Sequence, residues 1–224
     1  MVLEATEIEA VVQVRGITHL VHFTRVENLP QIFGRGLLPN SFNVKREINN
    51  RHDRNNDEIC LSITHPSKMF YKMRENDDSV AWCVLVLHPR VLWRHDCRFY
   101  PINAVSKILR DMGSDKFRGV GALQAMFAEE IENHERKIEE RGSHLLANMP
   151  TNEQAEVRVV GPIHPDFIYQ VYFNVEFDIK LFQSVAEPPH VAKFRGNGFW
   201  HQRDYLLTYS GREKYLKWLK DRFS

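Results

Sequence analysis

The sequence lacks the features of several classes of protein. It has only three cysteines among 224 residues, and none are spaced as the C-x-x-C pair of a zinc site. Its longest apolar run, "VAWCVLVLH" (80–88), is much shorter than the roughly 20 residues of a membrane-spanning helix. The N-terminus has no basic leader followed by an apolar stretch, so we expect no secretory signal. These absences favour a cytoplasmic protein with no membrane contact.

The common catalytic signatures are also missing. There is no G-x-S-x-G nucleophile turn, no phosphate-binding G-x-x-x-x-G-K and no G-x-G-x-x-G opening a helix. We expect Cys60, Cys83 and Cys97 to be packed, reduced thiols, which disfavours a cysteine nucleophile. The 11 histidines show no metal-ligand spacing, and the successive residues His95, Asp96 and Cys97 point apart. We therefore predict no metal.

Charge is nearly balanced overall, at +1, but it is unevenly distributed. Residues 193–224 contain 8 Lys/Arg and 3 Asp/Glu, a net of +5, with eight aromatic residues interleaved. Basic groups can hold phosphates while aromatic rings stack on bases, so Lys193, Arg195 and Arg203 are candidate nucleic-acid contacts. The alternative, favoured for the final segment "SGREKYLKWLKDRF", is an amphipathic helix that docks Tyr215, Leu216, Leu219 and Phe223 into the core.

The order of predicted elements favours one α+β domain. Apolar and β-branched runs predict strands at 18–24, 58–64, 80–87 and 169–175, and one that opens with Glu156. Helices are predicted at 26–35, where Gly36 ends the helix, and at 67–74, 104–111 and 122–141. Strands and helices do not alternate as in a doubly wound sheet. The long polar stretches 39–57 and 142–155 are typical of functional loops.

A few polar residues stand at the ends of the predicted strands. His22 and Thr24 alternate on the first strand and should share a face, and the same reasoning would place Gln154 beside Glu156. A glutamine and a glutamate side by side are suited to binding hydroxyls. Arg51 and Tyr71 lie in the first polar loop and the helix that follows. Each also fits an ordinary structural role, as a core histidine, a solvated arginine or a core tyrosine. Only the set taken together therefore indicates a functional site.

Five segments together resemble a known family. They are "LVHFTRVENLPQIFGRGLLP" (20–39), "NRHDRNNDEICLSITHPSKMFYK" (50–72), "VLHPRVLWRHDCRFYPINA" (86–104), "ALQAMFAEE" (122–130) and "PTNEQAEVRVVGPIHPDFI" (150–168). In this order they resemble the DarT family, NAD-dependent ADP-ribosyltransferase toxins that modify bases in DNA. The resemblance covers about residues 18–175. It implies the ADP-ribosyltransferase fold, a split β core flanked by helices. The residues at about 182–224 lie beyond this recognisable core and form a basic, aromatic C-terminal extension of the same domain.

The resemblance also implies roles for individual residues. His22, Thr24, Asn28 and Leu37 match positions around the nicotinamide side of NAD, and Tyr71 matches the aromatic residue that packs on nicotinamide. Arg51 matches an arginine that meets the NAD phosphate and the acceptor base. Glu156 matches the catalytic glutamate, with Gln154 placed to bind the acceptor. Where the family has S-x-P-N, this chain has Thr64-His65-Pro66-Ser67, which alters the pocket wall.

The expected function is therefore transfer of ADP-ribose from NAD to a base of single-stranded DNA. The resemblance implies the toxin of a toxin–antitoxin system, opposed by a cognate antitoxin. One alternative is the same chemistry on RNA or protein. Another is a catalytically silent module that binds NAD or nucleic acid, although His22, Arg51, Tyr71 and Glu156 are all present.

Overall fold

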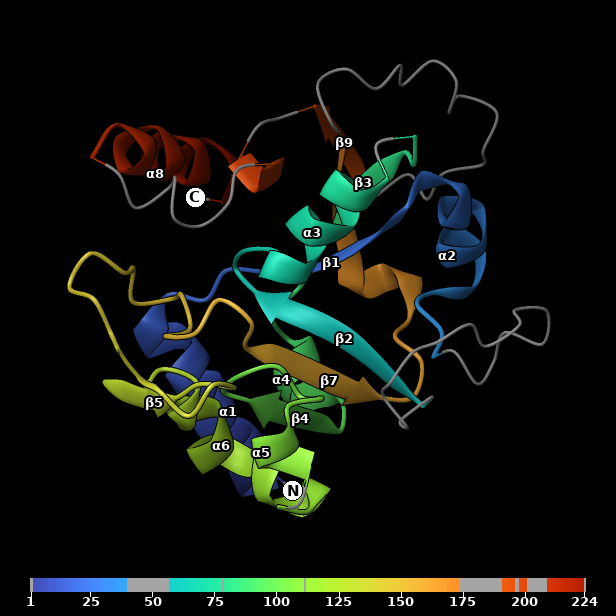
Figure 1. The fold of residues 1–224 in the computed structure, drawn as a ribbon. Coiled ribbons are helices and arrows are strands. Elements are labelled where there is room, and N and C mark those ends of the chain that lie inside the picture. The colour runs from blue at the N-terminus through green and yellow to red at the C-terminus, as the bar shows by residue number, and fades with distance from the viewer. Residues whose placement is uncertain are drawn as a thin grey trace.

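The computed structural model describes residues 2–39, 57–77, 79–110, 112–173, 191–195, 198–200 and 209–223. The helices and strands are shown in Figure 1. They are, in order, α1 (Val2–Arg15), β1 (Leu20–Arg25), η1 (Val26–Asn28), α2 (Leu29–Arg35), β2 (Glu58–Ile63), α3 (Lys68–Asn76), β3 (Trp82–Leu87), α4 (Val91–Arg94), β4 (Cys97–Tyr100), α5 (Lys107–Arg110), η3 (Ser114–Phe117), α6 (Gly119–Ala125), β5 (Glu130–Glu132), β6 (Ile138–Glu140), β7 (Glu156–Val160), η4 (Pro165–Phe167), β8 (Ile168–Phe173), β9 (Ala192–Arg195), η6 (Gly198–Trp200) and α8 (Tyr209–Phe223). None of the described helices combines the length and apolarity needed to cross a bilayer.

The centre of the fold is a seven-stranded sheet in the order β4-β7-β2-β1-β3-β8-β9. Its pairings are antiparallel except between β8 and β9. Strands β1 and β2 pair at only two positions, Leu20 with Ile63 and Val21 with Ser62. The sheet is therefore split into a β4-β7-β2 half and a β1-β3-β8-β9 half. This arrangement confirms the predicted α+β class with a split β core.

Two apolar clusters hold helices against the two faces of the sheet. The larger cluster joins Ile59 and Leu61 of β2 and Val157 and Val159 of β7 to α1, α2, α4 and α6. The second cluster covers the other face of the β1-β3-β8 half and includes Phe70 of α3. Figure 1 accordingly shows α3 on one side of β2 and α1 and α6 on the other. Because side chains alternate along a strand, each strand contributes to both faces.

Helix α2 confirms the predicted end at Gly36. Pro30 lies in its first turn, where a missing N–H costs nothing. Gly36 has a φ of 81°, and a Cβ at this position would lie 2.1 Å from the carbonyl oxygen of Ile163. Only glycine fits this close approach, because any side chain would collide with the neighbouring backbone.

The helix predicted at 122–141 is wrong beyond Ala125. Helix α6 ends at Ala125, and residues 130–140 form the β5–β6 hairpin. The Asn133 side chain accepts hydrogen bonds from the backbone N–H groups of Glu135 and Lys137, at 2.9 and 3.1 Å. Arg136 adopts a φ of 61°. A side chain that bonds its own backbone competes with the helix, and here the turn outweighs the helix propensity of the surrounding Glu and Arg.

Helix α1 and strand β4 were not expected from the sequence. In α1 Ile8 and Val12 enter the larger cluster, while Leu3 and Val14 are exposed. Its apolar residues therefore do not form one stripe, and helical periodicity is weak. Strand β4 is only four residues long, too short to give a clear alternating pattern. The residues around it, His95, Asp96 and Cys97, were considered as metal ligands instead.

The predicted C-terminal helix exists as α8, but its buried face differs from the expected one. Phe223 packs against the second cluster as predicted, together with Trp218. Leu216 is 41% exposed, so its predicted docking is wrong. The side chains of Tyr215 and Leu219 lie outside the described residues. The helix is turned so that Trp218 and Phe223, rather than Leu216, face the sheet.

Candidate active site

The polar face of the β4-β7-β2 half carries a set of ionisable side chains. Alternation buries Val157 and Val159 of β7 in the larger cluster and turns Glu156 and Arg158 to the opposite face. In the strand register Glu156 lies across from Tyr100 of β4, and Arg158 lies between Cys60 of β2 and Arg98 of β4. Three strands therefore bring their polar residues to one surface of the half-sheet.

Glu156 is buried, with 8% of its surface exposed. Arg158 donates from Nε and Nη2 to its Oε2 atom, at 3.1 and 3.0 Å. The Cys60 side chain and the backbone of Ala104 also hydrogen-bond its carboxylate. Burial raises the pKa of Glu156, while Arg158 and these hydrogen bonds act against the rise. The result is a desolvated carboxylate held by several donors.

Glu58 lies behind Arg158 and is itself almost fully buried. Its Oε2 atom is 3.7 Å from Arg158 Nη1, and its Oε1 atom forms an ion pair with Arg98. Glu58, Arg98 and Arg158 were missed in the sequence analysis. Arg158 could have been found, because it stands two residues after Glu156 in the same strand and so must share its face. Nothing in the sequence pairs Glu58 with it.

His22 lies where the two halves of the sheet separate. It follows Val21, the last residue of β1 that pairs with β2. Its Nδ1 atom is 2.8 Å from the backbone oxygen of Cys60. Since a carbonyl oxygen only accepts, Nδ1 carries the proton and donates. His22 and Glu156 therefore both contact Cys60, one at its backbone and the other at its thiol.

Thr24 and Asn28 are joined at the end of β1. The Asn28 side chain donates to Thr24 Oγ1 at 2.9 Å, which fixes the chain as it leaves the strand for η1. Leu37 lies further on, buried in the larger cluster, and its backbone exchanges hydrogen bonds with Ile163 at 3.0 and 2.9 Å. The structure thus brings Thr24 and Asn28 into contact and places Leu37 in the core.

Tyr71 lies in the second cluster rather than beside Glu156. Its hydroxyl donates to the backbone oxygen of Phe199 at 3.0 Å and is 3.4 Å from Nε2 of His65. Its ring lies nearly parallel to the His65 ring, at 16°. His65 belongs to the segment that departs from the family pattern, so this departure alters the surroundings of Tyr71.

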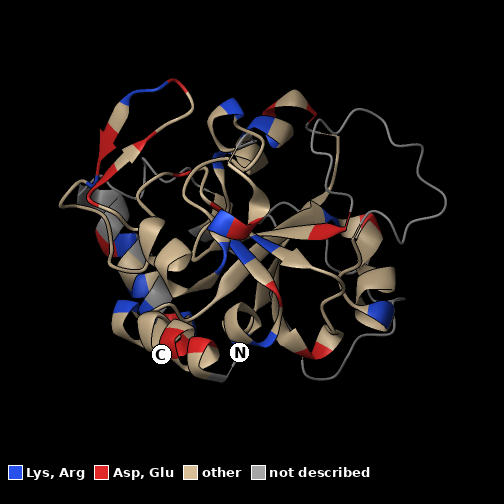
Figure 2. Cartoon of the chain, turned by 90° about the horizontal axis from the view of Figure 1, so that it is seen from below, with Lys and Arg blue, Asp and Glu red and all other residues tan. Residues whose placement is uncertain are grey.

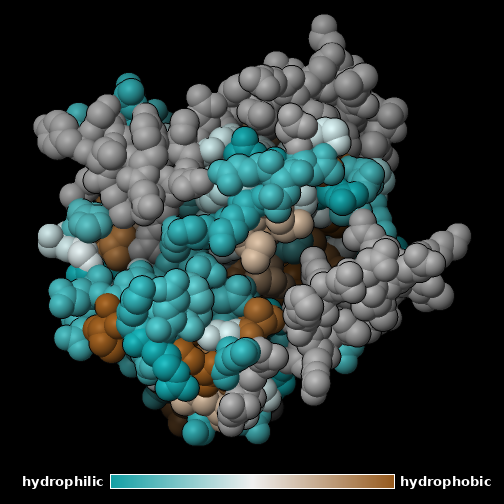
Figure 3. All heavy atoms as spheres, viewed as in Figure 1, coloured by the Kyte–Doolittle hydropathy of each residue, from teal (hydrophilic) through white to brown (hydrophobic). Residues whose placement is uncertain are grey.

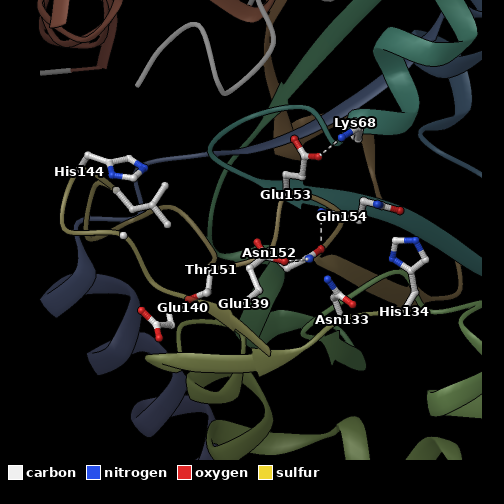
Figure 4. A pocket seen from close by; sticks show the side chains of 12 residues that line it. Lys68, Asn133, His134, Glu139, Glu140, His144, Thr151, Asn152, Glu153 and Gln154 are labelled. Atoms are coloured by element: carbon white, nitrogen blue, oxygen red, sulfur yellow. Dashed lines mark hydrogen bonds and ion pairs between the residues drawn. The ribbon is translucent and has the colours of Figure 1, made fainter. Parts of the chain in front are cut away.

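A cavity of about 330 Å³ opens beside the start of β7. Figure 4 shows its lining, which comes from α3, the β5–β6 hairpin and the segment before β7. Glu153 pairs with Lys68 at 2.6 Å, and Asn152 donates to Glu139 at 2.6 Å. The lining residues are Lys68, Asn133, His134, Glu139, Glu140, Gly142, His144, Leu145, Thr151, Asn152, Glu153 and Gln154. The cavity is thus rich in both donors and acceptors.

Gln154 lines this cavity but does not share a strand with Glu156. It lies in a turn, its backbone N–H bonded to Asn152 Oδ1 at 2.8 Å, and β7 begins only at Glu156. The expectation that strand alternation places Gln154 beside Glu156 is therefore wrong. The turn ends the alternating geometry on which that expectation depended.

The remaining predicted site residues cannot be placed in this geometry. Arg51 and Arg203 lie outside the described residues. Lys193 and Arg195 belong to β9, which pairs with β8, but their side chains lie outside the described part. Within the described ranges, no group of three or more His, Cys, Asp or Glu residues is arranged to hold a metal ion.

The described part of the chain is mixed in charge, and one face of it is hollowed. Figure 2 shows acidic and basic residues interspersed over the described chain, including the projecting β5–β6 hairpin. Figure 3 shows a hollow near the centre of the face, where apolar residues lie beneath a band of hydrophilic ones. Concave surfaces of this kind are where small molecules commonly bind.

Comparison with known proteins gives a family and a fold. The sequence model of the family described as "ssDNA thymidine ADP-ribosyltransferase, DarT" matches residues 21–193. The structure of Thermosipho africanus DarTG in complex with ADP-ribose is similar, with a TM-score of 0.53 and 15% identity. The match covers 82% of this chain and 51% of that one, so the chain spans about half the length of this relative. This likeness concerns the fold.

Two structures of Thermus sp. 2.9 DarT are less similar. The complex with NAD+ has a TM-score of 0.49 at 15% identity, covering 80% of this chain and 96% of that one. The complex with ADP-ribosylated ssDNA has a TM-score of 0.48 at 13% identity, covering 80% and 95%. No curated protein sequence matches the chain.

Proposed function

The chain belongs to the DarT family of ssDNA thymidine ADP-ribosyltransferases, and we propose that it transfers ADP-ribose from NAD to a thymidine of single-stranded DNA. The observation that carries the proposal is the position of Glu156. Its carboxylate is buried on β7, which is separated from the split in the sheet by one strand, β2, and shares Cys60 as a neighbour with His22. Both residues were selected from the sequence as members of one site.

The chemistry requires a buried carboxylate. As the bond from ribose C1′ to the nicotinamide nitrogen breaks, positive charge builds on the sugar, as it does in glycoside hydrolysis. Glu156 stabilises this charge from a site that excludes water, where electrostatic interactions are strong. Nicotinamide leaves with the electron pair of the broken bond, a ring nitrogen of the acceptor base bonds to C1′, and the proton of that nitrogen passes to solvent. The reaction needs no metal.

The donor pocket in this proposal is formed by residues around β1. His22, Thr24 and Asn28 lie on the nicotinamide side, with Leu37 behind them and Tyr71 on α3 as an aromatic wall. Their support is the resemblance, together with the hydrogen bond that fixes Asn28 on Thr24. Arg51 meets the pyrophosphate and favours loss of the proton from the base. Fixing NAD in a single pose supplies much of the rate enhancement.

The cavity before β7 is our proposed acceptor site. It is large enough for a nucleobase and presents Gln154, an uncharged amide that can hydrogen-bond a base. A base inside a duplex cannot reach such a cavity, which favours single-stranded or extruded nucleotides. Lys193, Arg195 and Arg203 are proposed to hold the backbone of the strand.

The wider assignment follows from family membership. We propose that residues 1–224 act as one ADP-ribosyltransferase domain with a C-terminal extension. The protein is proposed to act in the cytoplasm as the toxin of a toxin–antitoxin pair, where a cognate antitoxin reverses or blocks the modification. None of Cys60, Cys83 and Cys97 forms a disulfide, which fits a reducing compartment.

The test is incubation of the protein with NAD and oligonucleotides, followed by mass spectrometry. ADP-ribose should be added to thymidine-containing single-stranded DNA, with release of nicotinamide. Glu156→Gln removes the charge but keeps the shape, and should reduce transfer by about 100-fold or more. Arg51→Ala should also reduce transfer, whereas a solvated loop arginine would change nothing.

Tests with other acceptor molecules distinguish the proposed function from its alternatives. Modification of RNA or of a protein, but not of DNA, would keep the chemistry and replace the substrate. Binding of NAD without any transfer or hydrolysis would indicate a silent binding module. Undiminished transfer by Glu156→Gln would contradict the proposed mechanism.

A further inference from the structure

Arg158 and Glu58 have no role in the proposed function, yet they enclose its central carboxylate. We propose that Arg158, backed by Glu58, is a positioning residue that fixes the direction and the charge of the Glu156 carboxylate for the transfer step. This inference rests on the proposed function and deepens it. It assigns a role to two residues that the sequence analysis passed over.

The first support is the geometry of the contact. Two nitrogens of the same guanidinium, Nε and Nη2, meet one carboxylate oxygen at 3.1 and 3.0 Å. The planar guanidinium offers these donors in a rigid fork, and because both meet Oε2 they fix the position of that oxygen more firmly than one contact would. The residues stand two positions apart in β7 and share a face, so the contact depends on the strand itself. Glu156 is thus held in one orientation.

The second support is the order of charges. Glu156, Arg158, Glu58 and Arg98 follow one another with alternating sign across β7, β2 and β4. Arg158 and Arg98 are directly opposite in the register, and Glu58 contacts both. Glu58 therefore shields the two cations from each other and holds Arg158 near Glu156. The four charges sum to zero, which is the condition for burying them together.

The third support is the free-energy cost of burying these charged side chains. Glu58 is 2% exposed and Arg158 is 8% exposed in their side chains. Buried ion pairs contribute little to folding on balance, because desolvation offsets their attraction. The opposite face of the same strands already carries the apolar core. A costly polar cluster around one carboxylate is better explained by the demands on that carboxylate than by stability.

The groups that face Glu156 define the expected titration. They are Arg158 on its own strand, Cys60 and Glu58 on β2, Tyr100 and Arg98 on β4, and the backbone of Ala104. Without Arg158, Glu156 and Glu58 would be two buried carboxylates with one remaining cation, Arg98. Burial already raises the pKa of Glu156, and loss of Arg158 would raise it further. Less of the required anion would then be present at neutral pH.

The experiment compares Arg158→Gln and Arg158→Lys with the wild-type enzyme. In Arg158→Gln, kcat for transfer at neutral pH should fall by about 10-fold to 100-fold, the scale of a misplaced catalytic group. KM for NAD should stay nearly constant, because Arg158 is not in the donor pocket. The acidic limb of the pH–rate profile should move to higher pH. Arg158→Lys keeps the positive charge but loses the paired donors of the guanidinium. The acidic limb of its pH–rate profile should therefore stay near that of the wild type, while kcat falls.

The matched control is Arg118→Gln. Arg118 also forms an ion pair with a carboxylate, Asp96, but both side chains are exposed, and the variant should leave kcat and the pH profile unchanged. Titration of the Glu156 carboxyl carbon by NMR, in enzyme without NAD, should show the same shift to higher pH in Arg158→Gln. Thermal unfolding identifies any variant that fails to fold.

Each outcome decides the inference. Wild-type kcat and an unmoved acidic limb in Arg158→Gln would overturn it while leaving the proposed function intact. A raised KM with unchanged kcat would assign Arg158 to donor binding instead. If Arg158→Gln does not fold, Arg158→Lys decides, and full kcat in that variant would refute positioning. An inactive wild-type enzyme would count against the proposed function itself.

Discussion

The ring of Phe223, at the end of α8, lies nearly parallel to the imidazole of His19, just before β1. The ring centroids are 4.1 Å apart and the planes differ by 12°. Trp218 meets Phe199 and Tyr172 on the same face, at 4.8 and 5.7 Å. The C-terminal helix is therefore joined to the first strand of the sheet through a cluster of aromatic rings.

This contact predicts how substitutions in α8 affect stability. Phe223→Ala should lower the free energy of unfolding by about 1–3 kcal/mol, less than for a fully buried phenylalanine because Phe223 is only partly buried. Leu216→Asp, on the exposed side of the same helix, should change it by about 0.5 kcal/mol or less. Denaturant unfolding measures both. A larger effect at Leu216 than at Phe223 would mean that the opposite face of the helix docks.

His19 makes the stability dependent on pH. It is fully buried, its Nε2 donates to the Thr64 carbonyl at 2.8 Å, and its Nδ1 accepts from Thr18 at 2.8 Å. Burial lowers the pKa of His19 from 6.5 to about 4, with the Thr64 hydrogen bond opposing this. As the pH falls, the unfolded chain therefore takes up the proton before the folded protein does. The stability from neutral His19 is complete above about pH 6.5 and is lost as the pH falls toward 4.

We expect His19→Gln to remove this dependence. Between pH 7 and pH 4 the stability advantage of the wild type over the variant should narrow by on the order of 3 kcal/mol. Denaturant unfolding at several pH values measures the difference. His164→Gln, which removes an exposed histidine, is the control. A constant difference across this range would show that the pKa of His19 is the same in the folded and the unfolded protein.

The three cysteines should differ in their effect on transfer. The sequence predicted three packed thiols, and this holds for Cys83 and Cys97, whereas Cys60 is only half-buried. Burial raises the pKa of the Cys97 thiol to about 12 and raises that of Cys83 as well, so both should resist a mild thiol reagent. Cys60 should react first, and because its thiol touches Glu156, the adduct should block transfer.

A Cys60→Ser variant distinguishes a chemical role of the Cys60 thiol from steric blocking by the reagent adduct. The serine hydroxyl can still donate to Glu156, so transfer should remain within about threefold of the wild type, far from the roughly 100-fold loss of a preorganised group. The variant should also be resistant to the reagent. Loss of activity in the reagent-treated variant would place the sensitive group elsewhere.

Local sequence patterns predicted much of the sheet because they depend on local chemistry. The apolar runs of β1, β2, β3, β7 and β8 lie within a few residues of their expected bounds, and Gly36 ends α2 as predicted. Failures arose where a single side chain or a tertiary contact decided the structure. Asn133 turned the expected long helix into a hairpin, and α1 depends on a core that only the rest of the chain provides.

The site residues were likewise predictable only in part from the sequence. Strand alternation and family resemblance selected His22 and Glu156, which the structure brings to a common neighbour, Cys60. Neither could reveal that Glu58 stands behind Arg158, because the register of β2 against β7 is a tertiary property. The cavity before β7 was equally hidden, since its walls come from α3, the hairpin and the Thr151–Gln154 segment.

The basic tail gives the most distinctive prediction about the acceptor. If Lys193, Arg195 and Arg203 hold the backbone of the DNA strand, replacing all three by Gln should weaken DNA binding and flatten its dependence on salt. Each lost phosphate contact should reduce the slope of log K against log salt by about 0.7 on single strands. KM for NAD should barely change, because the proposed donor residues all precede β3.

The control is a triple variant of α8, Lys214→Gln, Lys217→Gln and Lys220→Gln, which likewise loses three positive charges. These three lysines are exposed on a helix that docks through Trp218 and Phe223, so their loss should change the slope little. Equal flattening by both triple variants would indicate a general effect of net charge. An unchanged slope in the first variant would assign residues 193–203 to packing, and the strand would then be held by residues 134–155, which already form most of the acceptor cavity.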